Sequence, residues 1–275
     1  MIIVVLVFLG LCFGSFINAL VWRTYKQSKA TSKKKAAEYS LSKGRSMCVN
    51  CGHVLAAVDL LPVISWFSLR GKCRYCNKKI SWQYPLVETI TAVLFVASYV
   101  WWPSSLDSGL QIASFVTWLV ALVGLVALCV YDLRWMILPN RIVFPVGAIA
   151  ALSAVLTIVD KGTKQSVFEV VSSVLIGGGL FYLLFQISKG KWIGGGDVKL
   201  GFVLGALIAV PGQAALMLFI ASMLGTLVSL PMIINKKLTP TTRVPFGPFL
   251  IAATIIVKLF GASILNWYLH TFVGI

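Results

Sequence analysis

The chain has 275 residues, of which 59% are hydrophobic and only 12% are charged. Soluble domains have about a quarter of their residues charged, so this composition excludes an ordinary soluble enzyme and predicts an integral membrane protein. The net charge of +16 would by itself suit a nucleic-acid-binding protein. The basic residues gather in loops between apolar segments, however, so the expected partner is the lipid bilayer and no nucleic acid is expected.

Apolar segments long enough to cross about 30 Å of hydrocarbon recur along the whole chain. The predicted fold class is therefore an all-α polytopic membrane protein with about eight transmembrane helices. They are expected at about 1–22, 84–103, 110–131, 142–159, 166–188, 198–211, 213–234 and 246–270, and the sixth is short. The first segment lacks a basic n-region and a small-residue cleavage pattern, so we expect a retained helix rather than a signal peptide.

The distribution of Lys and Arg predicts the side of the membrane on which each loop lies. Residues 23–83 hold 13 of the 24 basic residues. Eight more lie in three turns, at 132–141, 189–199 and 235–245. The turns on the opposite side contain only Lys161 and Lys164. The positive-inside rule places the large loop and the three basic turns in the cytoplasm, and an even number of spans leaves both termini outside.

The first part of the large loop is rich in Lys and Ser and poor in apolar residues. It reads TYKQSKATSKKKAAEYSLSKGRS from residue 24 to residue 46. Such a composition favours a solvated, mobile connector, because it cannot bury enough apolar surface to fold. The alternative is a basic arm held to anionic lipid head groups, at about 1 kcal/mol for each basic residue near the surface.

The second part of the loop carries two C-x-x-C pairs, Cys48–Cys51 and Cys73–Cys76, with 21 residues between them. This spacing is typical of a zinc ribbon, in which four thiolates close a tetrahedral Zn²⁺ site with no open position. A cytoplasmic location argues against structural disulfides. We therefore predict a structural metal site, with free or redox-active cysteines as the alternative. His53 follows the first pair but is not needed as a ligand.

Only eight carboxylates occur in the chain, and the predicted topology separates them. Three lie at the outer face, Glu38 lies among lysines, and Asp59 lies in the cysteine-bearing region. Glu88 lies one turn into the second span at its cytoplasmic end, and we keep it as a candidate. The remaining two are Asp132 and Asp197, each predicted at the cytoplasmic boundary of the membrane.

Asp132 lies in YDLRWMILPN and Asp197 lies in GGGDVKL. Their helices run in opposite directions, so a bundle can bring these two ends together. Two neighbouring carboxylates share a proton, and one then serves as base toward water while the other serves as acid toward a carbonyl. The alternative for each is a cap or an interfacial residue, and Asp197 alone would suit an N-cap of the sixth helix.

Residues around Asp197 suggest how the acid is held. Gly194 and Gly196 predict a backbone that bends or is approached closely. Gly201 and Gly205 form a small-xxx-small face on the sixth helix, which predicts a close helix–helix contact. Lys199 is expected either to support the charge of Asp197 or to extend to the interface.

Five segments in order carry a resemblance to a known family. They are GSFINALVWR (14–23), the four cysteines, LLPVISWFSLRGKCRYCNKKISWQYPLVE (60–88), YDLRWMILPN (131–140) and GGGDVKLG (194–201). Together they resemble the type IV prepilin peptidases, which are membrane aspartic proteases of the GxGD class. The resemblance covers nearly the whole chain.

The resemblance implies a function on the cytoplasmic side of the inner membrane. Such enzymes cleave the short basic leader of type IV prepilins and pseudopilins after a glycine, in support of pilus or type II secretion assembly. Asp132 and Asp197 match the family aspartates, and Gly194 and Gly196 match the glycines of its GxGD element. Many members then N-methylate the new N-terminal residue, usually Phe, with S-adenosylmethionine. Glu88 belongs to the YPLVE element and is our candidate for a role in methylation.

The implied domain organisation has three parts: a first transmembrane helix at 1–22, a cytoplasmic basic arm and four-cysteine insert at 23–83, and a seven-helix peptidase domain at 84–275. The departures from the family pattern lie in the insert: a longer lysine-rich arm, VDLLP in place of an acid–asparagine pair, and Val49 in place of a proline. They weaken the prediction of a methyltransferase more than that of a peptidase.

Three alternatives remain open from the sequence. The first is a peptidase without methyltransferase activity. The second is a presenilin-like or preflagellin-type protease with other substrates, in which the cysteine-bearing insert is not expected. The third is a non-enzymatic zinc-ribbon membrane scaffold whose basic loop binds nucleic acid or anionic lipid.

Overall fold

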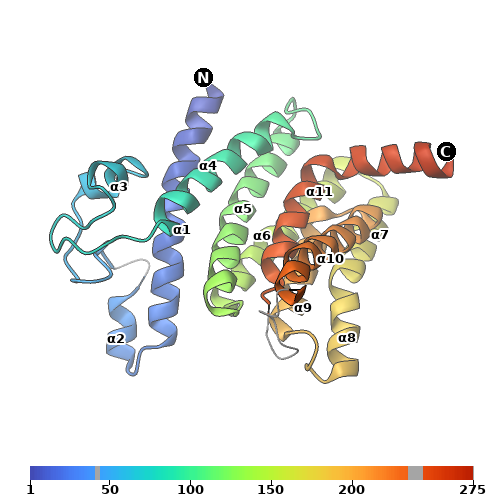
Figure 1. The fold of residues 1–275 in the computed structure, drawn as a ribbon. Helices are drawn as coiled ribbons and strands as arrows, with labels where there is room; N and C mark the ends of the chain where they lie inside the picture. The colour runs from blue at the N-terminus through green and yellow to red at the C-terminus, as the bar shows by residue number, and fades with distance from the viewer. Residues whose placement is uncertain (41–43, 235–243, 275) are drawn as a thin grey trace. The chain divides into compact units, whose positions relative to one another are not determined.

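The computed structural model describes residues 1–40, 44–234 and 244–274 (Figure 1). Within these ranges the regular elements are helices, and β-structure is limited to two isolated bridges, Met47 with Val54 and Lys72 with Lys79. The predicted all-α fold class is confirmed. The chain forms two compact units, residues 1–100 and 101–275. These units do not coincide with the predicted boundaries after residues 22 and 83, which follow membrane topology and stay a prediction.

Seven helical segments of the described chain are long and apolar enough to cross a membrane, so the protein is a multi-pass membrane protein. They are Ile2–Ser28, Gln83–Val100, Gly109–Trp135, Asn140–Lys161, Lys164–Ser188, Pro211–Leu230 and Gly247–Phe272. The remaining predicted span, 198–211, corresponds to α9 (Gly195–Ile208), which has only 14 residues. At 1.5 Å per residue α9 is about 21 Å long, which is shorter than the hydrocarbon core.

The first unit is built on the close packing of α1 (Ile2–Ser28) against α4 (Gln83–Val100). Gly10 and Gly14 make this approach possible, because an added Cβ would lie 2.5 Å from Cα of Ala92 at Gly10 and 2.4 Å from Cα of Glu88 at Gly14. Larger side chains at these two positions would keep the helices apart, so the two glycines determine the distance between α1 and α4. The buried Asn18 also joins the helices by donating a hydrogen bond to the Tyr84 carbonyl oxygen at 3.1 Å.

The described part of the lysine-rich arm folds back onto α1. α1 continues to Ser28, and the short α2 (Lys33–Glu38) follows it. The buried guanidinium of Arg23 donates hydrogen bonds to the carbonyl oxygens of Ser40 and Gly44 at 2.8 and 3.0 Å. These contacts hold the described part of the arm to α1, while the mobility and the lipid contact considered for the arm stay predictions. Most of the basic turn predicted at 235–245 lies outside the described residues.

The second unit is a helical bundle that contains α5 (Gly109–Trp135), in which Trp118, Leu122, Leu125 and Leu128 are fully buried. The other members are α6 (Asn140–Lys161), α7 (Lys164–Val174), a π-helical turn η2 (Leu175–Gly179), α8 (Leu180–Ser188), α9, α10 (Pro211–Ile234), α11 (Gly247–Tyr268) and a terminal π-helical turn η3 (Leu269–Val273).

Helix α9 packs closely against α7 and η2, as its glycines predicted. An added Cβ would lie 2.5 Å from the Gly177 carbonyl oxygen at Gly201, and 2.6 Å from the Ser173 carbonyl oxygen at Gly205. The Ser173 hydroxyl donates a hydrogen bond of 2.7 Å to the Gly205 carbonyl oxygen, so backbone and side chain both join the two segments. The predicted close contact at Gly201 and Gly205 is confirmed.

The end of α9 needs polar partners, because a helix that stops short of the far side of a bilayer leaves carbonyl groups without water. Ala209 has a left-handed backbone with φ 61°, and its N–H bonds to the Gly205 carbonyl oxygen. The ammonium group of Lys258, from α11, donates a hydrogen bond of 2.8 Å to the Leu207 carbonyl oxygen. A cation at a helix C-terminus also complements the helix dipole, which accounts for a lysine within an apolar span.

Candidate functional site

Asp132 lies in the last turn of α5, and its side chain is only 5% exposed. The helix ends just after it, because Met136 adopts a left-handed conformation (φ 53°) and its N–H bonds to the Asp132 carbonyl oxygen at 2.8 Å. The carboxylate oxygen Oδ2 is buried and has no hydrogen-bond partner among the described residues. A buried polar atom without a partner costs free energy, so it marks a group reserved for a ligand or for chemistry.

Asp197 lies in the first turn of α9, where Gly194 is the N-cap residue. The Asp197 N–H donates to the Gly194 carbonyl oxygen at 3.1 Å, so the acid lies within the helix and is not the predicted alternative, an N-cap. A carboxylate in a first helical turn is stabilised by the helix dipole. An added Cβ at Gly194 would lie 3.3 Å from Asp197 Oδ2, so this glycine leaves one side of the carboxylate open.

The segments that carry the two aspartates converge on one side chain, that of Leu138. Leu138, in the loop after α5, lies between their segments. An added Cβ at Gly196 would be 3.1 Å from Leu138 Cβ, and one at Gly247 would be 3.7 Å from Leu138 Cδ2. The predicted juxtaposition of the ends of α5 and α9 is therefore present in the fold.

Gly247, at the start of α11, is a site residue that the sequence analysis missed. An added Cβ there would lie 2.6 Å from Oδ2 of Asp132, which no real Cβ tolerates. The glycine lets the backbone of α11 approach the acid directly. The available signal was the pair Gly247–Pro248, with a glycine where a helix starts and a proline in its first turn.

Lys199 does not support the charge of Asp197 in the way the sequence suggested. Its ammonium donates a hydrogen bond of 2.9 Å to Oδ1 of Asn140 and lies over the Phe144 ring. Among the described residues it forms no ion pair with Asp197. The side chain points along the helix face toward α6, so Lys199 links α9 to the first turn of α6.

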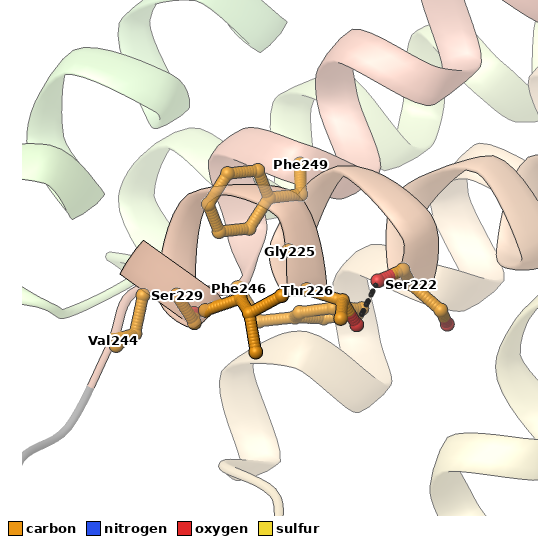
Figure 2. Close-up of a pocket in the computed structure, with 8 residues that line it drawn as sticks. Ser222, Gly225, Thr226, Ser229, Val244, Phe246 and Phe249 are labelled. Atoms are coloured by element: carbon orange, nitrogen blue, oxygen red, sulfur yellow. Dashed lines mark hydrogen bonds between the residues drawn. The ribbon is translucent and has the colours of Figure 1, made fainter. Parts of the chain in front are cut away.

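A pocket of about 360 Å³ lies between α10 and the start of α11 (Figure 2). Phe246 lines it and directly precedes Gly247, so the pocket and the Asp132 carboxylate adjoin one short segment. The remaining walls are Phe249 and Val244 on one side and Ser222, Gly225, Thr226, Ser229 and Leu230 of α10 on the other. The hydroxyls of Ser222 and Thr226 bond to carbonyls of their own helix, which leaves a mainly apolar cavity.

Glu88 lies elsewhere, in the first unit, where it is buried on α4. Its Oε2 accepts a hydrogen bond of 2.7 Å from the backbone N–H of Val63, and the Ser15 hydroxyl also bonds to the carboxylate. Val63 has φ 61°, a value that is a genuine outlier for a β-branched residue. Glu88 therefore holds the strained turn before α3 (Ile64–Ser68) against α4.

The four cysteines lie together as the sequence predicted. Their sulfur atoms are all within 4.8 Å of one another, and Sγ of Cys48 and Cys76 are 4.0 Å apart. In a tetrahedral thiolate site with metal–sulfur bonds of about 2.3 Å the sulfurs are about 3.8 Å apart, so the cluster can hold a metal ion. His53 lies outside the cluster, stacked on Tyr75 with ring centroids 3.7 Å apart.

The two cysteine pairs are held in matching turns. The Cys48 N–H bonds to the His53 carbonyl oxygen, and the Cys73 N–H bonds to the Lys78 carbonyl oxygen, both at 2.9 Å. Gly52 and Asn77 follow the second cysteine of each pair and both have positive φ, at 72° and 56°. Both cysteine pairs therefore form the same kind of turn, with glycine or asparagine at the position that requires a left-handed backbone.

Asp59 lies outside the cysteine cluster and holds the turn between Cys73 and Cys76. Its carboxylate accepts hydrogen bonds from Arg74 Nε at 2.8 Å and Tyr75 Oη at 2.9 Å, and both donors lie between Cys73 and Cys76. Desolvation raises the pKa of Asp59, but the bonds from Arg74, Tyr75 and the Ala56 N–H outweigh it and lower the pKa below 3.8. Because the pKa is lower in the folded state, these contacts stabilise the fold at pH values above the pKa of the unfolded chain. The stabilisation is lost as the pH falls through the pKa of the folded state.

Replacing Asp59 by Asn is expected to reduce the affinity of the cluster for its metal about tenfold, since groups that orient metal ligands contribute about that much. The measurement is metal retention against a competing chelator at neutral pH. Asp107→Asn, at an exposed acid outside the first unit, is the matched control. Equal retention by Asp59→Asn and Asp107→Asn would show that the Asp59 contacts do not support the cluster.

Comparison with known proteins places these features in one family. Residues 8–102 match the model of the bacterial peptidase A24 N-terminal domain, and residues 119–230 match that of the type IV leader peptidase family. The chain is 32% identical to a prepilin leader peptidase/N-methyltransferase from Aeromonas salmonicida over 97% of its own length and 94% of the relative. The chain belongs to the type IV leader peptidase family.

Other relatives with the same name have similar sequence identity to this chain. The prepilin leader peptidase/N-methyltransferase of Pseudomonas aeruginosa is 30% identical, with 96% of this chain and 92% of the relative covered. That of Bacillus subtilis is 28% identical, with 84% and 87% covered. No solved structure matches the chain. The predicted resemblance is confirmed as family membership.

Proposed function

We propose that this protein is a prepilin peptidase that removes the leader of type IV prepilins and pseudopilins after a glycine, with Asp132 and Asp197 as its catalytic pair. The observation that carries the proposal is the convergence at Leu138 of the segments that carry the two aspartates, together with the buried Oδ2 of Asp132, which has no hydrogen-bond partner among the described residues. Gly194, Gly196 and Gly247 support this proposal, because each removes a side chain from the immediate surroundings of the pair.

The chemistry that suits this pair is direct attack by water. Two carboxylates this near do not both carry a charge easily, so they hold one proton between them. The ionised member takes a proton from water, whose oxygen bonds to the scissile carbonyl carbon, while the protonated member donates to the carbonyl oxygen. Collapse of the tetrahedral intermediate breaks the C–N bond. The leaving amine takes the proton that the first aspartate removed from water, and a hydroxyl of the intermediate returns a proton to the second aspartate. No covalent enzyme intermediate is required.

The substrate proposal follows from the position of the site in the chain. A prepilin has an apolar N-terminal helix in the bilayer and a short basic leader in the cytoplasm, so its scissile bond lies at the membrane boundary. The pocket beside Gly247 would receive an apolar side chain that follows this bond, because Phe246 and Phe249 give it aromatic walls. The proposed location is the inner membrane, with the site and the cysteine cluster facing the cytoplasm and both termini outside.

We also propose N-methylation of the new N-terminal residue with S-adenosylmethionine, since the named relatives are N-methyltransferases as well as peptidases. Glu88 stays our candidate for that activity. Its bonds to Val63 and Ser15 favour a role in holding the insert against α4 over direct contact with the methyl donor.

The proposed metal at the cysteine cluster is a structural Zn²⁺, because four thiolates leave no open position for a substrate or water. We expect about one zinc ion per chain in purified protein and its loss in the double variant Cys48→Ser/Cys76→Ser. Elemental analysis measures both, and Cys12→Ser/Cys129→Ser, which leaves the cluster intact, is the control. Wild-type protein prepared without chelator and free of zinc would contradict the assignment.

The experiment that tests the function is mass spectrometry of a prepilin incubated with purified enzyme, with and without S-adenosylmethionine. A product shortened at the leader glycine and heavier by one methyl group only with the donor supports both activities. Shortening without methylation retains the peptidase and removes the methyltransferase. No cleavage of an authentic prepilin by folded, zinc-containing enzyme would overturn the proposal and favour the non-enzymatic scaffold.

A further inference from the structure

The cysteine-bearing insert presents an exposed apolar face that neither the metal cluster nor the peptidase site explains. It consists of Leu61, Ile64, Phe67 and Trp82, whose side chains are 46, 65, 58 and 66% exposed. Trp66 packs beneath it, with ring centroids 5.3 Å from Phe67 and 4.1 Å from Trp82. Large exposed apolar clusters of this kind are uncommon on protein surfaces in contact with water.

The depth of this face in the membrane follows from the length of α4. With 18 residues α4 is about 27 Å long, so nearly the whole helix is needed to cross about 30 Å of hydrocarbon. Glu88 then lies about 8 Å along the helix from Gln83, inside the boundary rather than outside it. Because the Val63 N–H bonds to Glu88, the residue that precedes α3 is held at that depth.

The direction of the face follows from the helical register of α4. The Leu86 N–H bonds to the Trp82 carbonyl oxygen, so Trp82 extends the hydrogen-bond pattern of α4 by one residue. Leu86, Ile90 and Val93 are all exposed and follow Trp82 at helical spacing. Exposed apolar residues along one face of a membrane helix form its lipid-facing side. Trp82, and with it Phe67, lies at the end of that stripe.

The chemistry of the surroundings suits the boundary between head groups and acyl chains. Trp rings concentrate at this level in membrane proteins, and basic residues beside them contact lipid phosphates. The indole N–H of Trp66 bonds to the Ile80 carbonyl oxygen, at the end of the Lys72–Lys79 hairpin. Arg70, Lys72 and Lys79 on this hairpin are exposed.

We propose that the insert is anchored in the lipid interface at the start of α4, with Ile64, Phe67 and Trp82 among the upper acyl chains. In this arrangement α3 holds the cysteine cluster at the bilayer surface, and the cluster does not move freely in the cytoplasm. Phospholipid is the occupant that the observations favour, since depth and register both come from contacts with α4. A second copy of the chain or the apolar helix of a substrate would be a different occupant.

The test places the photoreactive residue p-benzoyl-L-phenylalanine at Phe67 in the full chain, reconstituted in nanodiscs that contain phosphatidylcholine and phosphatidylglycerol. The matched control carries the same residue at Val49, an exposed apolar side chain between two cysteines of the cluster. After irradiation, mass spectrometry counts phospholipid adducts. The expected yield is about tenfold higher at Phe67 than at Val49, because an anchored side chain stays within reach of acyl chains.

Equal lipid adducts at the two positions would overturn the proposal. So would a Phe67 product consisting mainly of a cross-linked second copy, or of cross-linked prepilin when this is added. The count is made on protein that retains its bound metal, which reports a folded insert. The same probe at Ile64, the more exposed residue of α3, repeats the test independently if the Phe67 variant loses metal.

Discussion

Asp132→Asn and Asp197→Asn are each expected to lower the rate of prepilin cleavage by about 10²–10⁴-fold, the usual contribution of a general acid or base. The amide has nearly the same shape as the carboxylate but neither takes nor gives a proton at neutral pH. The two effects should not add in the double variant, because the carboxylates act as one unit on one water molecule. Initial rates of leader removal measure both points.

The control for this pair is Asp160→Asn, which changes an exposed acid at the end of α6 and should cleave at the wild-type rate. Methylation of a leader-free substrate provides a second control, since methyl transfer involves no peptide-bond hydrolysis and is expected to persist in both single variants. Wild-type cleavage by either Asp132→Asn or Asp197→Asn would remove that residue from the mechanism. Loss of both activities together would instead indicate a folding defect.

Gly247→Ala is expected to have the second largest effect, because its methyl group would lie 2.6 Å from Oδ2 of Asp132. Either the start of α11 or the carboxylate has to move by several tenths of an ångström or more. A displacement of about 1 Å at a reacting group can reduce the rate about 100-fold. Overpacking of this kind also costs about 1–3 kcal/mol of stability. Cleavage rate and thermal unfolding of the variant measure the two effects.

The matched control is Gly179→Ala in the same unit, where an added Cβ meets nothing within 4 Å. Gly179→Ala should retain the wild-type cleavage rate, since there is space for a methyl group at position 179 and the backbone there is helical. A Gly247→Ala variant with the wild-type rate would mean that the approach of α11 to Asp132 has no part in catalysis. A variant that loses stability but keeps its rate would assign the glycine to packing alone.

Glu88 shows that a residue selected from the sequence can make contacts that the sequence does not predict. The sequence marked it as a carboxylate at a membrane boundary, which is costly and therefore worth explaining. The sequence does not predict that Val63, with its strained backbone, lies beside Glu88 and donates its N–H to the carboxylate. This contact joins residues 25 positions apart in the chain, and it depends on how the insert folds.

Lys199 and Gly247 are instructive in the same way. Lys199 is two residues from Asp197, yet its side chain binds Asn140, because residues two apart on a helix point in different directions. Gly247 is 115 positions from Asp132, yet its backbone touches the carboxylate. Distance along the chain was a poor guide to contact in both cases.

By itself the sequence determined the membrane class, the approximate spans and the four-cysteine cluster, and it predicted the two aspartates as a pair. These features depend on composition, on segment length and on ligand spacing, all of which are local or periodic properties of the chain. Only the tertiary structure decided which neighbours complete the site, namely Gly247 and Leu138. The reason is that contacts between helices depend on rotation and depth, and hydrophobic patterns fix neither to within one side chain.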